Sequence, residues 1–153
     1  MALIGLISDT HGLLRPQAVE ALRGCAHILH AGDIGAVEIV AGLEAIAPVA
    51  AIRGNVDTGA WAERYPEEVT ITVAGVRIHI VHDVQALALD AAAEGIGMVV
   101  SGHSHKAGHV VREGVHYVNP GSAGPRRFRL PVTVARVVTG AAPWRVEFIE
   151  LAV

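Results

Sequence analysis

Five short apolar runs of this chain each lead directly into aspartate, asparagine or histidine residues. Each run is brief and continuous, as in a buried β-strand, and the five are residues 3–7, 28–31, 49–52, 78–81 and 98–101. In open α/β sheets, ligands bind in the crevice beyond the carboxyl ends of the strands. The pattern therefore predicts an α/β fold in which polar side chains from distant parts of the chain meet at one edge.

Helices are predicted between these runs. One begins at Pro16 and ends before Gly24, because proline is favoured in the first helical turn and glycine just after the last. Apolar residues at the helical period predict a second helix over 36–46. An alanine-rich segment predicts a third over 85–94, ended by Gly95.

Paired strands are predicted in the remaining segments. The two hairpins are 69–73 with 76–81 around Ala74-Gly75, and 110–112 with 115–118 around Glu113-Gly114. The closing strands are 131–138 and 145–151, joined by 139–143. We expect the whole chain, residues 1–153, to form one α/β domain with mixed sheets, helices early and hairpins late.

Composition excludes several classes of protein. No apolar run approaches the ~18–20 residues of a membrane span, and the apolar start at 2–7 lacks the positive leader of a secretory signal. Cys25 is the single cysteine, so neither an intrachain disulfide nor a Cys-x-x-Cys site can form, which favours a reducing cytoplasm. The formal net charge of −3 argues against nucleic acid as a bulk partner.

Two local enrichments need an explanation. Nine histidines occur in a chain of which 18% is charged, and histidine is the commonest side-chain ligand of metals. The arginines Arg126, Arg127 and Arg129 form the one basic cluster. This cluster is either a solvated loop or an anchor for an anionic substrate beside an active site.

Seven side chains that follow the apolar runs are candidate metal ligands: Asp9, His11, Asp33, Asn55, His82, His103 and His105. The Asp-x-His and His-x-His pairs each place two side chains on the same side of an extended segment, where they can chelate one ion. Carboxylate and imidazole without cysteine suit divalent Mn²⁺, Fe²⁺, Ni²⁺ or Zn²⁺. Glycines precede three ligands at tight turns, at Gly32, Gly54 and Gly102.

Each of these elements alone also has a plain structural interpretation. An isolated Asp-x-His is more often a helix cap or a turn, and Asp33 could cap the helix that begins near Ala36. Asn55 could be a turn residue, His82 a strand-end histidine, and 103–105 a surface loop. The ordered set of five, each at a strand end, favours a metal site.

The other histidines and the rival motifs carry less weight. We interpret His27, His79 and His116 as structural, His30 as close enough to support the site, and His109 as following the His-x-His loop. Lys106 stands where a nucleophile elbow requires glycine. The sequence holds no Gly-x-x-x-x-Gly-Lys-Ser/Thr loop and no strand-linked Gly-x-Gly-x-x-Gly.

The ordered motifs are Asp9-Thr10-His11, Gly32-Asp33, Gly54-Asn55-Val56-Asp57, His82, Gly102-His103-Ser104-His105 and Asn119-Pro120-Gly121-Ser122. This set resembles the calcineurin-like metallophosphoesterase superfamily, most closely its short prokaryotic phosphodiesterase branch, and it covers most of the chain. The resemblance implies a four-layer αββα sandwich of two mixed β-sheets flanked by helices, with a dinuclear metal centre at one edge.

The resemblance also implies roles for single residues. Asp9, His11 and His105 would hold one cation, Asn55, His82 and His103 the other, and Asp33 would bridge both; Asn119 to Ser122 would support the His-x-His segment. Mn²⁺ is the first candidate metal, with Ni²⁺, Fe²⁺ or Zn²⁺ as alternatives. The implied reaction is hydrolysis of a small phosphodiester, in which a hydroxide shared by the metals attacks phosphorus in line and Asp33, Asn55 and His82 take part.

Two positions depart from the family pattern. Val56 stands where larger members carry a histidine that assists the leaving group, and Asp83 follows His82 where the family often has His-Gly-His. The source of the leaving-group proton and the shape of the substrate pocket therefore stay open. So do two other functions: a non-catalytic interaction scaffold, like the retromer subunit that resembles this family but has lost ligands, and a phosphomonoesterase. A homo-oligomer is compatible with the sequence.

Overall fold

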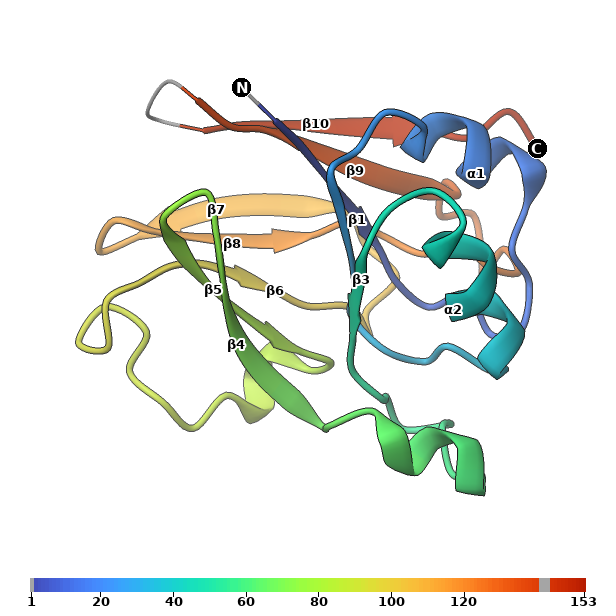
Figure 1. Cartoon of the computed structure of the whole chain (residues 1–153), viewed down its shortest axis with the longest axis horizontal. Helices are drawn as coiled ribbons and strands as arrows, with labels where there is room; N and C mark the ends of the chain where they lie inside the picture. Colours follow the sequence, from blue (N-terminus) through green and yellow to red (C-terminus); the bar gives the residue numbers. More distant parts are fainter. Residues whose placement is uncertain (1, 141–143) are drawn as a thin grey trace.

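The computed structural model describes residues 2–140 and 144–153, and two five-stranded sheets form its body (Figure 1). The first sheet has the order β10-β9-β1-β2-β3, with β1 (Leu3–Ile7), β2 (His27–His30), β3 (Val49–Ala51), β9 (Thr133–Val138) and β10 (Arg145–Glu150). The second has the order β4-β5-β6-β8-β7, with β4 (Glu68–Val73), β5 (Val76–Val81), β6 (Ile96–Val100), β7 (Gly108–Arg112) and β8 (Val115–Asn119).

Both sheets are mixed, as predicted. In the first sheet β1, β2 and β3 are parallel, whereas β9 and β10 pair antiparallel. In the second sheet β5, β6 and β8 are parallel, with antiparallel β4 and β7 at the edges. The carboxyl ends of the three parallel strands in each sheet therefore lie at one edge, which is where the candidate ligands begin.

Successive side chains of a strand point to opposite faces of its sheet, so the apolar residues of the first sheet contribute to two separate core layers. On β1, Ile4 and Leu6 point between the sheets, where they pack with Ile78 and Met98 of the second sheet. Ile7 points to the opposite face and joins the core beneath the helices. The inner core thus fixes one sheet against the other, and the outer core fixes the helices on the first sheet.

Two α-helices cover the outer face of the first sheet (Figure 1). They are α1 (Pro16–Leu22) and α2 (Val37–Glu44), and they pack through Ala18, Leu22, Val40 and Leu43. The described chain also contains two short 3₁₀ helices, η1 (Ala60–Arg64) and η2 (Val84–Ala86), and Trp61 of η1 packs against the same core as α1 and α2. Within 2–140 and 144–153, no helix has both the length and the apolar character needed to cross a membrane.

The predicted helix over 85–94 is wrong, because the segment contains only the 3₁₀ turn η2 and further turns. Leu87, Leu89 and Ala91 instead pack against the outer face of the second sheet, around Val99. Apolar residues at every second position suit an irregular segment lying on a sheet, so tertiary packing overrides alanine's helix propensity. In the described chain, helices flank the first sheet and this turn-rich segment covers the second.

The other predicted elements are confirmed, with ends that differ by no more than two residues. The predicted fold class, an α/β sandwich of two mixed sheets, is likewise confirmed. The predicted connection 139–143 lies partly outside the described residues.

Candidate metal centre

The seven candidate ligands lie on loops after β1, β2, β3, β5 and β6. Five of them have positive φ, between 47° and 71°: Asp9, His11, Asp33, His103 and His105. Residues with a Cβ rarely occupy this left-handed region, because the Cβ then crowds the backbone. Such strain persists only where surrounding structure enforces it, and it is concentrated at functional sites.

Two aspartates each have one carboxylate oxygen fixed by the protein and the other turned to the cluster. Asp9 Oδ2 accepts hydrogen bonds from Ser8 Oγ at 2.8 Å and from the His103 backbone N–H at 3.1 Å. Asp33 Oδ1 accepts from the Val56 N–H at 3.1 Å. The other oxygen of each carboxylate, Asp9 Oδ1 or Asp33 Oδ2, faces the imidazole rings of the cluster.

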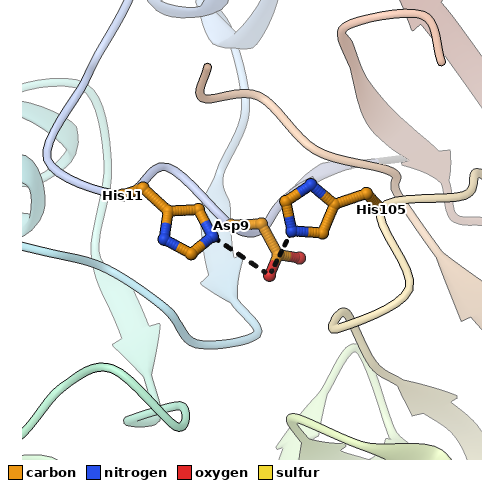
Figure 2. Close-up of side chains that lie close together, drawn as sticks. All are labelled: Asp9, His11 and His105. Atoms are coloured by element: carbon orange, nitrogen blue, oxygen red, sulfur yellow. Dashed lines mark ion pairs between the residues drawn. The ribbon is translucent and has the colours of Figure 1, made fainter. Parts of the chain in front are cut away.

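Three imidazoles surround these oxygens. Figure 2 shows His11 and His105 on either side of the Asp9 carboxylate, with Nε2 atoms 3.9 Å and 3.5 Å from Asp9 Oδ1. His82 Nε2 lies 3.9 Å from the same oxygen and 3.1 Å from Asp33 Oδ2. His11 Nε2 is also 3.7 Å from Asp33 Oδ2, so the two carboxylates share their imidazole neighbours.

The His82 ring is held by its other nitrogen. Nδ1 donates a hydrogen bond of 2.7 Å to the Ala31 carbonyl, which can only accept. In the neutral ring the lone pair is then on Nε2, which faces the two carboxylates. A ring oriented this way by a backbone carbonyl is typical of histidines that bind metal.

The donor set fits divalent cations. Two overlapping groups, Asp9 with His11 and His105, and Asp9 with Asp33 and His82, have ligand atoms within 4.8 Å of one another. Ligands about 2.1 Å from a shared cation stand roughly 3–3.5 Å apart, close to the distances found here. Six buried side-chain atoms lack a hydrogen-bond partner among the described residues, and four of them belong to candidate ligands: Asp9 Oδ1, His11 Nε2, His82 Nε2 and His105 Nδ1. Buried polar atoms are seldom left unpaired, and a bound cation is one standard reason.

The crowding of charge alters the pKa values of these groups. Burial raises the pKa of Asp9, against the opposing influence of Ser8 and His82. At Asp33 burial acts in the same direction, but the contact with His82 and the Val56 hydrogen bond outweigh it and lower the pKa to about 2. Burial also lowers the pKa of His82, yet Asp33 and Ala31 outweigh it and the net shift is upward. Without metal, Asp33 and His82 therefore favour an ion pair.

The remaining two candidates lie at the border of this cluster. His103 is half-exposed, with its ring centroid 5.2 Å from that of His82 and its Nε2 3.9 Å from Asp83 Oδ2. Asn55 is exposed and, with His82, lines a cavity of about 480 Å³. The structure thus brings five candidates into close contact and places Asn55 and His103 beside them.

Close backbone approach explains two of the glycines in the motifs. A Cβ at Gly54 would overlap Asp33 Oδ1, and a Cβ at Gly102 would overlap Ser8 Oγ and come within 2.6 Å of Asp9 Oδ2. The ligand loops are consequently packed so tightly that only glycine fits between them.

Three further residues brace the loops. Asp57 is 4% exposed and accepts hydrogen bonds from the backbone N–H groups of Ile34, Gly35 and Gly54, which ties the Asp33 loop to the Asn55 loop. Asn119 Nδ2 donates to the Gly102 carbonyl at 2.9 Å, and Ser122 Oγ donates to the Asp9 carbonyl at 3.1 Å. Asn119 thus contacts the His-x-His loop, as the resemblance implied, whereas Ser122 contacts the Asp9 loop. Sequence reasoning gave Asp57 no role.

The other histidines have local partners of their own. His30 accepts a hydrogen bond from the Gly32 N–H and contacts Thr10 Oγ1 at 3.0 Å, so it braces the site without joining the ligand groups. His79 contacts Thr70 and Glu68 on the neighbouring strand. His109 and His116 pair with each other at 2.9 Å on the β7–β8 hairpin.

Comparison with known proteins gives consistent results. Residues 2–141 match the family model described as "Calcineurin-like phosphoesterase superfamily domain". A probable metallophosphoesterase of Methanothermobacter thermautotrophicus is 34% identical, with 88% of this chain and 86% of the relative covered. One from Bacillus subtilis is 31% identical, with 81% and 76% covered.

Solved structures share the fold at lower identity. A structure described as a novel archaeal phosphodiesterase has a TM-score of 0.79 at 22% identity, covering 96% of this chain and 99% of its own. Vps29 from Entamoeba histolytica complexed with Zn²⁺ has a TM-score of 0.74 at 20% identity, covering 97% and 98%. Together with the match over nearly the whole chain, these relatives show that the chain belongs to the calcineurin-like phosphoesterase superfamily.

Proposed function

We propose that this protein hydrolyses small phosphodiesters with the aid of two divalent cations held where the two sheets meet. Asp9, His11 and His105 would hold one cation and Asn55, His82 and His103 the other, with Asp33 between them. The observation that carries this proposal is that two carboxylate oxygens, Asp9 Oδ1 and Asp33 Oδ2, both face imidazole nitrogens 3.1–3.9 Å away.

The protein's own side chains and backbone groups would anchor the cations and orient the substrate. Bound divalent cations supply a water of lowered pKa and neutralise charge on the phosphoryl oxygens. Ser8, Val56 and Ala31 hold the donor groups in place through the hydrogen bonds already described. Asn55 and His82 line the adjoining cavity, which supports a role for both in contacting the phosphoryl group of a substrate.

The finer specificity is also a proposal. A diester is favoured because a structural neighbour covering 96% of this chain is described as a phosphodiesterase. Mn²⁺ is favoured as the metal because carboxylate, amide and imidazole ligands without thiolate suit it. Metal analysis of the purified protein, followed by assays of diester and monoester with Mn²⁺, Ni²⁺ and Zn²⁺, tests both points. Faster turnover of p-nitrophenyl phosphate than of bis(p-nitrophenyl) phosphate would contradict the diester preference.

Replacement of Asp33 tests the proposed function. Asp33→Asn keeps the side-chain shape but removes the shared negative charge, so kcat/KM for bis(p-nitrophenyl) phosphate should fall at least ~100-fold and bound metal should fall with it. Asp90→Asn is the matched control, because Asp90 is an exposed carboxylate outside the candidate ligand set that accepts a hydrogen bond from the Ala93 N–H. Full Mn²⁺-supported turnover by Asp33→Asn would remove Asp33 from the mechanism.

A scaffold function is the second candidate, since Vps29 structures share the fold with TM-scores of 0.73–0.77 among the solved neighbours. The same assay separates the two functions. Protein that carries both metals yet turns over neither diester nor monoester would favour the scaffold.

A further inference from the structure

The cavity beside the candidate metal centre has a distinct chemical character. It measures about 480 Å³ and lies between the 53–58 loop, the start of β4 and the end of β5. Asn55 and His82 belong both to its wall and to the candidate ligand set. His82 is 5% exposed, and its Nε2 has no hydrogen-bond partner among the described residues. A phosphoryl group at the metal centre would therefore have this cavity as its neighbour.

Acidic groups dominate the cavity wall. Among the lining residues, all of them described, four are carboxylates and one is a cation: Asp57, Glu67, Glu68 and Asp83 against Arg53. Arg53 is already engaged, since Nη1 donates to the Tyr65 carbonyl at 2.6 Å and Nη2 lies 3.3 Å from Glu67 Oε1. The wall thus offers no uncommitted cationic side chain to an anionic group.

Two of the carboxylates retain acceptor capacity. Asp83 Oδ1 accepts from the Gln85 N–H at 3.0 Å, while Oδ2 has only His103 Nε2 at 3.9 Å. Glu68 Oε2 contacts His79 Nε2 at 3.2 Å, and half of the Glu68 side chain is exposed. Asp57 differs, because three backbone N–H groups occupy its oxygens. Glu68 and Asp83 therefore give the cavity negative charge, to which Glu67 adds, although Arg53 partly offsets Glu67.

We propose that this cavity holds one alcohol group of the phosphodiester and selects an alcohol that carries an ammonium group. The inference rests on the proposed function and adds the substrate class to it. A cleft lined by one sign of charge concentrates ligands of the opposite sign and repels those of the same sign. A second phosphate or carboxylate on the substrate would meet Glu68 and Asp83, and no uncommitted cationic side chain among the lining residues would offset their charge.

A matched pair of substrates isolates the charge. p-Nitrophenyl phosphorylcholine and its 3,3-dimethylbutyl analogue release the same phenol and have nearly the same shape, but the first carries a quaternary ammonium group. We expect kcat/KM for the choline ester to be at least ~5-fold higher at low salt and the preference to shrink in 0.5 M NaCl, because salt screens exposed charges. Free choline should inhibit competitively, and 3,3-dimethylbutanol should inhibit less.

Variants assign the preference to the wall. Glu67→Gln and Asp83→Asn should each reduce the choline-to-dimethylbutyl ratio towards one, whereas Glu63→Gln, an exposed carboxylate of η1 outside the cavity, should leave it unchanged. Equal kcat/KM values for the two esters, with bis(p-nitrophenyl) phosphate still hydrolysed, would overturn this inference and leave the proposed function intact. No turnover of any ester by the metal-loaded protein would overturn both.

Discussion

Single residues of the site hold conformations that the chain would otherwise avoid. Asp9, His11, Asp33, His103 and His105 all have positive φ, at a cost of about 1 kcal/mol or more for each residue. The sequence predicted the ligand types because Asp-x-His, Gly-Asp and His-x-His are local motifs at strand ends. It did not predict their backbone conformation, which depends on contacts with loops far away in the sequence.

Gly102 is expected to be indispensable for the position of Asp9. In Gly102→Ala the added methyl would overlap Ser8 Oγ, so we expect a loss of about 1–3 kcal/mol in the free energy of unfolding and at least ~10-fold weaker Mn²⁺ binding. Gly108→Ala is the control, because a Cβ there meets nothing within 4 Å. Urea unfolding and metal titration measure both effects. Equal behaviour of the two variants would contradict the packing described here.

His30 is expected to make the fold sensitive to acid. Its complete burial lowers its pKa from 6.5 to about 4, so the unfolded chain binds a proton at pH values where the folded chain does not. The free energy of unfolding should therefore fall as the pH drops from about 6.5 to about 4, by roughly 3 kcal/mol from this group, whose contribution does not change further at lower pH.

Urea unfolding across this pH range tests the prediction. His30→Gln cannot titrate, so its free energy of unfolding should depend less on pH than that of the wild type. If the variant does not fold, the His30 ring resonances of the wild type should show no titration above pH 5. Parallel pH curves, or a ring that titrates near 6.5, would contradict the assignment.

The observed secondary-structure elements agree with the predicted ones wherever a local sequence pattern specifies the element. Strand β1 and the β4–β5 hairpin formed at the predicted residues, because a continuous apolar run or a turn dipeptide specifies each of them. The 85–94 segment does not form its predicted helix, because its leucines pack against the outer face of the second sheet. The role of Asp57 could not be predicted from a local pattern either. Its three backbone donors come from two loops that only the fold brings together.

A proline substitution distinguishes the observed 85–94 segment from the helix that its sequence favours. Ala88 is exposed and belongs to no helix, and Leu87 before it has φ −64° and ψ 116°, which suits a residue preceding proline. We therefore expect Ala88→Pro to change the free energy of unfolding by less than about 1 kcal/mol, as measured in urea. A loss of about 3 kcal/mol or more, typical of proline inside a helix, would show that the segment is helical in solution.

At the scale of the whole molecule, the candidate ligands are divided between the two sheets. Asp9, His11, Asp33 and Asn55 follow strands of the first sheet, whereas His82, His103 and His105 follow strands of the second. Bound cations would thus connect the sheets, in addition to the apolar core between them. The resemblance made a two-sheet sandwich predictable, but the close contact of Asp9 with both His82 and His105 is visible only in three dimensions.

Metal removal should accordingly destabilise the whole fold. A ligand that binds only the folded state at 100 times its Kd adds about 2.7 kcal/mol for one site. We expect EDTA to lower the Tm and Mn²⁺ to restore it, as measured by calorimetry, with Asp33→Asn responding less than the wild type. A Tm that is identical with EDTA and with Mn²⁺ would argue against cations at this junction.

The division of the ligands has a practical corollary. Neither sheet carries all of the candidate ligands, so the absorption spectrum of a bound coloured ion such as Co²⁺ would report how the two sheets are aligned. Substitutions deep in the inter-sheet core, many ångströms from any donor atom, should alter the absorption spectrum of bound Co²⁺ even where they leave the protein folded.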